Sequence, residues 1–292
     1  FIEEENEKHF RLRSLREKSA PTSEKNIPPE EDSFRNLGAP PGTFSDIPLS
    51  TIPVQELLPF FDWKMFYTVC GLKPVPDAET PRREIRKTAL EYLSEGEFTV
   101  SRHVRFFDCI SRGDDIVSTD GSFHIPMLRQ ESGRKLSIAR FFHPEEPRQL
   151  GIFAIRVEHS HPCCHAHTDL IKHAVSVTLT EAASSMTAKL LGERADKNSI
   201  TEKLKIILPG IGYPCCPDHS LKRDILGLLD IGIRLSDSCA MLPESSICGL
   251  VIANTRAEFH DIRRISAEQY SDYSARRGFS PEEASLFLSH LL

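Results

Sequence analysis

The sequence predicts an α+β fold from the order of its helical and β segments. Segments with the apolar pattern of strands and segments with the pattern of helices occur in separate runs, not in the strict β-α-β alternation of parallel sheets. The chain also has 292 residues, of which 39% are hydrophobic and 27% charged. This is ordinary for a globular protein with one large domain or two small ones. A chain of this length can bury a sizeable core.

Residues 1–50 differ in composition from the rest of the chain. A charged opening from Glu3 to Lys18 is compatible with a short helix. The prolines that follow break any regular pattern, and they are Pro21, Pro28, Pro29, Pro40, Pro41 and Pro48. We therefore expect residues 1–50 to form an extended or partly helical linker, and residues 51–292 to form the domain.

The first half of the domain combines helical and β patterns. Thr80 and Pro81 open a helix that we expect to run to about Ser94. Residues 104–117 predict a β-hairpin with its turn at residues 112–115. A continuous apolar run at residues 151–157 predicts a buried strand.

The second half begins with a helical repeat that predicts a long amphipathic helix at about residues 166–191, with its apolar side on the sheet. Asp218 is expected to be the N-cap of a helix that ends at about Leu229. Residues 241–253 predict a strand pair. Ser266 begins a short C-terminal helix with the spacing of a capping box. Ser280 begins a second one, with Ser at the N-cap, Pro281 at the first helical position and acidic residues in the first turn.

Composition also excludes several classes of partner. The net charge of -6 and the absence of a run dense in Lys and Arg argue against nucleic acid. The apolar runs are shorter than the roughly 20 residues of a membrane-spanning helix, and the acidic start is unlike a signal peptide. Eight cysteines are too sparse for a disulfide scaffold. We expect a cytoplasmic protein with reduced thiols and no membrane partner.

The segment from Ile207 to His219 is the most informative part of the sequence. It combines two glycines, three prolines and Tyr213, which is the composition of a rigid, exposed turn that enters a helix. Glycine lets a flat ligand approach the backbone, proline reduces the entropy lost on ordering, and the tyrosine ring offers a stacking face. The residues alone leave two interpretations open: a ligand platform, or a strand-to-helix connection without a ligand.

This segment is similar to the Arg-x-x-x-Gly-Tyr-Pro-x-Cys-Pro-(Asp/Glu)-His motif of the activation, or reactivation, domain of cobalamin-dependent methionine synthase. The similarity covers nearly everything after residue 50, and the charged opening resembles the linker that leaves the cobalamin-binding domain. Further matching segments are residues 61–63, 113–116, 235–243, 247–253 and 269–283.

The resemblance implies a single C-shaped α+β domain built on a twisted antiparallel sheet that is flanked by helices. Such a domain binds S-adenosylmethionine in a shallow groove and docks on a cobalamin-binding domain, in cis or in trans. A flavodoxin-like or other donor supplies an electron, S-adenosylmethionine supplies a methyl group, and the inert cob(II) form returns to methylcobalamin. The chain would then be a region of a methyltransferase of methionine biosynthesis that places cofactors without catalytic residues of its own.

The resemblance also implies ligand-binding residues. Acidic side chains suit the ammonium and sulfonium of S-adenosylmethionine, and an arginine suits its carboxylate. The positions that match the family's ligand-side residues are Asp62, Glu181, Glu202, Leu208, Gly210, Gly212, Tyr213, Pro214 and Phe259.

Two of these positions depart from the family pattern. Leu208 stands where the motif has its carboxylate-binding arginine, and Phe259 replaces a tyrosine. Loss of one member of a buried charge pair costs roughly 2 to 5 kcal/mol, so we predict that S-adenosylmethionine binding is weak or lost. Lys203 and Lys205 are the candidates for a substitute point charge.

Two other functions stay open at this stage. The domain is an interaction module for a corrinoid protein if its S-adenosylmethionine site is degenerate. Alternatively, the histidines and cysteines of residues 159–167 bind zinc, although their spacing matches no common zinc site. We expect Cys215 and Cys216 to be structural.

Overall fold

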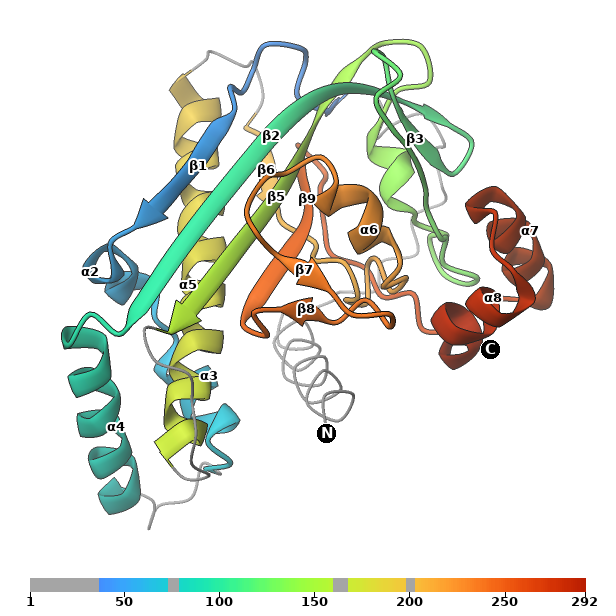
Figure 1. Cartoon of the computed structure of the whole chain (residues 1–292). Coiled ribbons are helices and arrows are strands. Elements are labelled where there is room, and N and C mark those ends of the chain that lie inside the picture. The colour runs from blue at the N-terminus through green and yellow to red at the C-terminus, as the bar shows by residue number, and fades with distance from the viewer. Residues whose placement is uncertain (1–36, 73–78, 160–167, 198–202) are drawn as a thin grey trace.

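The computed structural model describes residues 37–72, 79–159, 168–197 and 203–292. An open, seven-stranded antiparallel sheet forms its centre (Figure 1). The strand order is β4-β3-β2-β5-β9-β6, and β1 pairs with β2 beside this path. The strands are β1 (Ile47–Ile52), β2 (Phe98–Arg112), β3 (Asp115–Ser118), β4 (His124–Pro126), β5 (Arg148–His159), β6 (Lys205–Ile207) and β9 (Ser246–Asn254), and β7 (Arg234–Leu235) and β8 (Met241–Leu242) form a separate pair.

Helices cover both faces of this sheet. The longest helix, α5 (Thr168–Lys197), runs behind β2 and β5, and α6 (Leu221–Leu226) lies on the opposite face (Figure 1). The other α-helices are α2 (Val54–Leu57), α3 (Trp63–Val69), α4 (Glu79–Ser94), α7 (Ala267–Arg277) and α8 (Pro281–Leu288). Within the described ranges, no helix is both long enough and apolar enough to cross a membrane.

The two central strands are buried on both faces, which explains their continuous apolar sequences. Successive side chains of a strand point to opposite faces. In β5, Phe153 and Ile155 join the core on the α5 side, whereas Ile152 and Ala154 join the core on the α6 side. The residues of β9 alternate in the same way.

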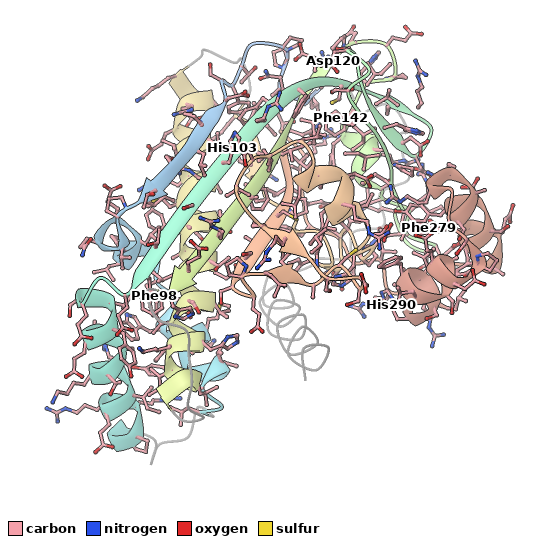
Figure 2. All side chains as sticks on the ribbon, in the orientation of Figure 1. Phe98, His103, Asp120, Phe142, Phe279 and His290 are labelled. Atoms are coloured by element: carbon pink, nitrogen blue, oxygen red, sulfur yellow. The ribbon has the colours of Figure 1, made fainter. Side chains whose placement is uncertain are left out.

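Three hydrophobic cores result from this arrangement. Phe98 belongs to the core between the sheet and α5, and Phe142 belongs to the core on the α6 side. Phe279 packs against the third core, which α7 and α8 form with the end of the chain. Figure 2 shows these three phenylalanines at widely separated places on the ribbon.

The predicted α+β class is confirmed, and so are most of the expected elements. The hairpin turns where predicted, with Arg112 paired to Asp115. The helix expected from Thr80 to about Ser94 is α4, and the buried strand at residues 151–157 is the centre of β5. The long helix continues to Lys197, which is beyond its predicted end.

Two expectations about the second half were wrong. Asp218 is not a helix N-cap: α6 begins after Ser220 and ends at Leu226, short of the expected Leu229. The strands at residues 241–253 do not pair with each other, because β8 pairs with β7 whereas β9 lies between β5 and β6.

The C-terminal helices begin at the expected residues. Ser280 and Glu283 form both hydrogen bonds of a capping box. Ser266 accepts a hydrogen bond from the Gln269 backbone, which is half of a box. The other half comes from elsewhere in the chain, since the Ser266 backbone donates to Glu131 Oε1.

The domain extends back at least to residue 37, which lies within the segment expected to be a linker. Strand β1 begins at Ile47, and the Phe44 side chain belongs to the core on the α5 side. The Ala39 backbone donates to Ala253 O and accepts from Gln149 N. Residues 37–50 therefore form part of the sheet and its core.

Asp218 instead joins helix α7 to the loop that precedes α6. Its side chain is 1% exposed. It accepts hydrogen bonds from the Ser220 backbone at 2.8 Å and from the Tyr273 hydroxyl at 2.9 Å, and it pairs with Arg277 Nε at 3.4 Å. Arg277 also pairs with the half-exposed carboxylate of Asp224, with 2.7 Å between Arg277 Nη1 and Asp224 Oδ2. Burial makes the Asp218 contacts the stronger anchor, because water does not compete for them.

We predict that Asp218→Asn lowers the free energy of unfolding by about 3 kcal/mol, because it leaves the buried Arg277 cation short of a partner. The matched change Asp224→Asn removes an exposed partner of the same arginine and should cost less than about 1 kcal/mol. Urea denaturation of both variants measures the difference. Equal losses would contradict the assignment of Asp218 as the buried anchor.

Candidate functional site

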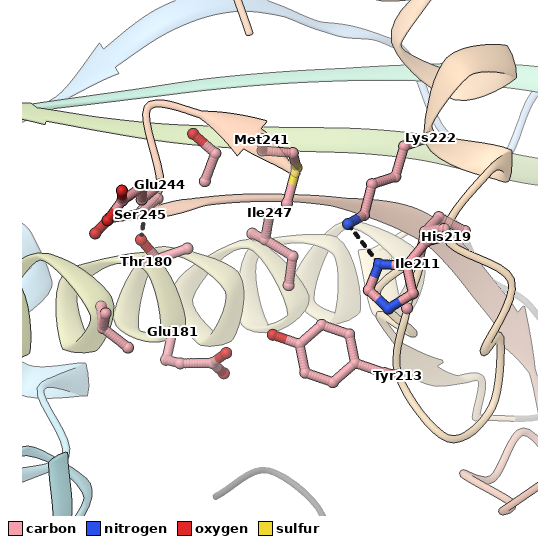
Figure 3. Close-up of a pocket in the computed structure, with 13 residues that line it drawn as sticks. Thr180, Glu181, Ile211, Tyr213, His219, Lys222, Met241, Glu244, Ser245 and Ile247 are labelled. Carbon is pink, nitrogen blue, oxygen red and sulfur yellow. Dashed lines mark hydrogen bonds between the residues drawn. The ribbon is translucent and has the colours of Figure 1, made fainter. Parts of the chain in front are cut away.

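A pocket lies between helix α5, the turn at residues 211–213 and the start of β9 (Figure 3). The residues that line it are Val177, Thr180, Glu181, Ile211, Gly212, Tyr213, His219, Lys222, Met241, Glu244, Ser245, Ser246 and Ile247.

Hydroxyl groups on α5 fix the helix to one wall of this pocket. The Thr180 hydroxyl donates to Ser176 O at 2.9 Å within the helix, and it also contacts Ser245 O at 3.0 Å. The Ser245 hydroxyl donates in turn to Ser176 Oγ at 2.9 Å. Because these buried hydroxyl and carbonyl groups form hydrogen bonds with one another, the wall of the pocket tolerates polar residues. Helix α5 also holds Glu181 at the pocket.

Backbone pairing with β9 fixes the opposite wall. The Ile211 backbone donates to Cys248 O at 2.9 Å, and the Leu250 backbone donates to Pro209 O at 3.0 Å. A Cβ atom on Gly249 would collide with Pro209 O. Glycine at position 249 therefore permits the loop to lie directly on the strand.

The two loop glycines make room for rings of the protein itself. A Cβ atom on Gly210 would lie 2.6 Å from the Tyr213 ring, and one on Gly212 would lie 2.5 Å from the His219 ring. Gly212 also has a φ of +89°, a conformation that L side chains rarely adopt. The space that the sequence suggested for a flat ligand is therefore filled by Tyr213 and His219, which form the pocket wall.

Charged groups of opposite sign occupy different ends of the pocket. Glu181, which is 8% exposed, and Glu244 lie toward one end, and His219 and Lys222 lie toward the other, as Figure 3 shows. Lys222 Nζ lies 2.9 Å from His219 Nδ1. Burial, with a smaller effect of the nearby Lys222, lowers the pKa of His219 to about 3. At neutral pH this ring is uncharged and accepts a hydrogen bond from the lysine.

The structure brings together three of the nine residues expected to bind a ligand. Glu181, Gly212 and Tyr213 line the pocket. Gly210 lies under the Tyr213 ring, and Pro214 is buried where its carbonyl accepts from Ile262 N at 2.8 Å.

Three further expected residues, which are Asp62, Leu208 and Phe259, do not line the pocket. Asp62 is the N-cap of α3 and accepts from the backbones of Lys64 and Met65. Leu208 is 5% exposed and belongs to the core on the α5 side, whereas the Phe259 side chain is 44% exposed. Glu202 lies outside the described residues.

Several pocket residues were not predicted from the sequence. The sequence could have predicted that His219 and Lys222 lie close together, because a spacing of three residues places two side chains on the same side of a helical turn. Lys203 and Lys205, the cations that the sequence suggested, are exposed and do not line the pocket. The sequence has no pattern that places residues 244–246 at the pocket, because their position depends on how β9 packs against α5.

The segment of the zinc hypothesis lies outside the described residues except for His159, whose ring packs against Phe98 at 5.1 Å. Among the described residues, no group of three or more His, Cys, Asp or Glu side chains is placed to hold a metal. Cys215 and Cys216 are buried in the core on the α6 side. Burial raises the pKa of the Cys216 thiol well above its usual value, so this thiol stays protonated.

Comparison with known proteins gives a family and a fold. Residues 53–278 match the family described as vitamin B12 dependent methionine synthase, activation domain. The crystal structure of the MetH reactivation domain bound to AdoHcy is similar in fold, with a TM-score of 0.72 at 20% sequence identity. That similarity covers 90% of this chain and 94% of the other chain.

One buried and one partly buried histidine predict acid sensitivity. Burial lowers the pKa of His219 to about 3 and that of His260 to about 4, below the 6.5 of an unperturbed histidine. As the pH falls below 6.5, the unfolded chain therefore binds protons that the folded chain does not. Each histidine should reduce the free energy of unfolding by about 1.2 kcal/mol between pH 6 and 5.

Urea denaturation at pH 7, 6 and 5 measures this slope. His260→Asn removes one of the two groups and should make the slope shallower by about that amount. A slope that His260→Asn leaves unchanged would contradict the burial of a neutral His260.

Proposed function

The chain belongs to the family of vitamin B12-dependent methionine synthase activation domains, and from this premise we propose that its pocket binds S-adenosylmethionine. The observation that carries the proposal is the pocket itself, which combines carboxylate, aromatic and cationic groups. The bound ligand would serve the reductive methylation of cobalamin held by a separate domain, in cis or in trans.

The residues present fit such a ligand. Glu181 and Glu244 provide negative charge for its ammonium and sulfonium groups, and Tyr213 provides an aromatic wall. The Ser246 hydroxyl lies at the pocket, is buried, and has no hydrogen-bond partner among the described residues. A buried polar group without a partner is costly, so a ligand that hydrogen-bonds to Ser246 would relieve this cost.

Placement is the contribution that the domain makes in this proposal. S-adenosylmethionine supplies the methyl group, and a flavodoxin-like or other donor supplies the electron. The chain's own residues hold the ligand between α5 and the 211–213 turn and keep its reactive end at the pocket mouth. Holding reactants in a fixed geometry removes much of the entropic cost of bringing them together.

A second candidate function rests on Leu208. Because this side chain lies in the core, position 208 supplies no cation to the pocket. A domain that no longer bound S-adenosylmethionine would still present a surface to a corrinoid protein. The prediction that binding is weak or lost stays open to the titration that follows.

We expect isothermal titration of the chain with S-adenosylmethionine to show saturable binding. Glu181→Gln should weaken this binding at least tenfold, because it removes a buried charge from the cationic groups of the ligand. Glu193→Gln is the matched control, since Glu193 lies on the same helix with a half-exposed side chain outside the pocket. It should leave the affinity unchanged.

Absence of binding by the native chain would refute the proposal and favour the docking function. Equal effects of the Glu181 and Glu193 changes would place the ligand elsewhere on the domain.

A further inference from the structure

We propose that Lys222 binds the carboxylate of the ligand, in place of the arginine that the related motif carries at position 208. The inference rests on the proposed function, because it concerns the orientation of S-adenosylmethionine in the same pocket. It assigns the role to a residue of α6 that lies 14 positions beyond Leu208 in the sequence.

Leu208 is separated from the ligand by its packing. Its side chain is 5% exposed, belongs to the core between the sheet and α5, and does not line the pocket. An arginine introduced there would place an unpaired charge in this core. The cation for a carboxylate must therefore come from another position.

Lys222 is the one lysine or arginine among the described residues that line the pocket. It is 3% exposed, and its ammonium donates to His219 Nδ1 at 2.9 Å and to Cys239 O at 3.0 Å. A lysine ammonium has three donors. The third donor is left for a group inside the pocket.

The described residues give this ammonium no salt-bridge partner. His219 is neutral at neutral pH, and the Cys239 carbonyl carries only a partial charge. Burial raises the pKa of the nearby Cys248 thiol to about 12, so this group is neutral as well. Burial lowers the pKa of Lys222, and the longer-range attraction of Asp218 opposes this shift. The Asp218 carboxylate already pairs with Arg277 and Tyr273.

A buried cation without a counter-ion is costly, and an anion from the ligand removes this cost. The other end of the pocket carries Glu181 and Glu244, which would repel a carboxylate and attract the cationic groups. The distribution of charge therefore selects one orientation for an amino-acid ligand, with its carboxylate at Lys222.

The test compares S-adenosylmethionine with its decarboxylated analogue, which keeps the adenosine, the sulfonium and an amine. We expect the native chain to bind S-adenosylmethionine at least tenfold more tightly than the analogue. Lys222→Met should abolish this preference and leave affinity for the analogue within about threefold of the native value. Lys222→Gln, which keeps a donor for His219, should also lose the preference. Isothermal titration measures all affinities, and thermal unfolding checks that each variant is folded.

The matched control is Lys205→Met, because Lys205 is exposed on β6 and does not line the pocket. It should keep the native preference. Equal binding of the two ligands by the native chain, or a preference that survives in both folded Lys222 variants, would overturn the role of Lys222 while ligand binding itself stands. Binding of neither ligand by the native chain would overturn the proposed function and this inference with it.

Discussion

The pairing of the 209–211 segment with β9 is the constraint on which the rest of the site depends. Only a glycine at position 249 lets the Pro209 carbonyl approach this strand so closely. The contact turns the following residues toward α5, so that Tyr213 covers Gly210 and His219 covers Gly212. Lys222 then reaches the pocket from the first turn of α6. Backbone contact in the sheet thus sets the positions of side chains that are far apart in the sequence.

Much of the fold could be predicted because its signals are local. The turn at residues 112–115 and the helix start at Ser280 depend on neighbouring residues, and both are found in the structure. Asp218 was misread because its partners, Tyr273 and Arg277, lie on a distant helix. A preference for the N-cap position is weak beside a buried hydrogen bond to tertiary partners.

The site was less predictable than the fold, for the same physical reason. The loop motif located Gly212 and Tyr213, and the resemblance located Glu181, all of which line the pocket. The sequence alone did not show that the Leu208 side chain packs into the core, because this residue follows the end of β6 and its burial depends on how the chain packs against α5. Nor did it show that Lys222 is buried without a salt bridge to a described residue, since burial depends on the packing of α6 against the loop.

The central claim is that the pocket between α5 and the 211–213 turn holds the S-adenosylmethionine-type ligand. A crystal structure of this chain with S-adenosylhomocysteine tests it most directly. The account predicts density beside Glu181 and Tyr213, with the ligand carboxylate within hydrogen-bond distance of Lys222 Nζ. Ligand density at another surface, with this pocket empty, would contradict the account.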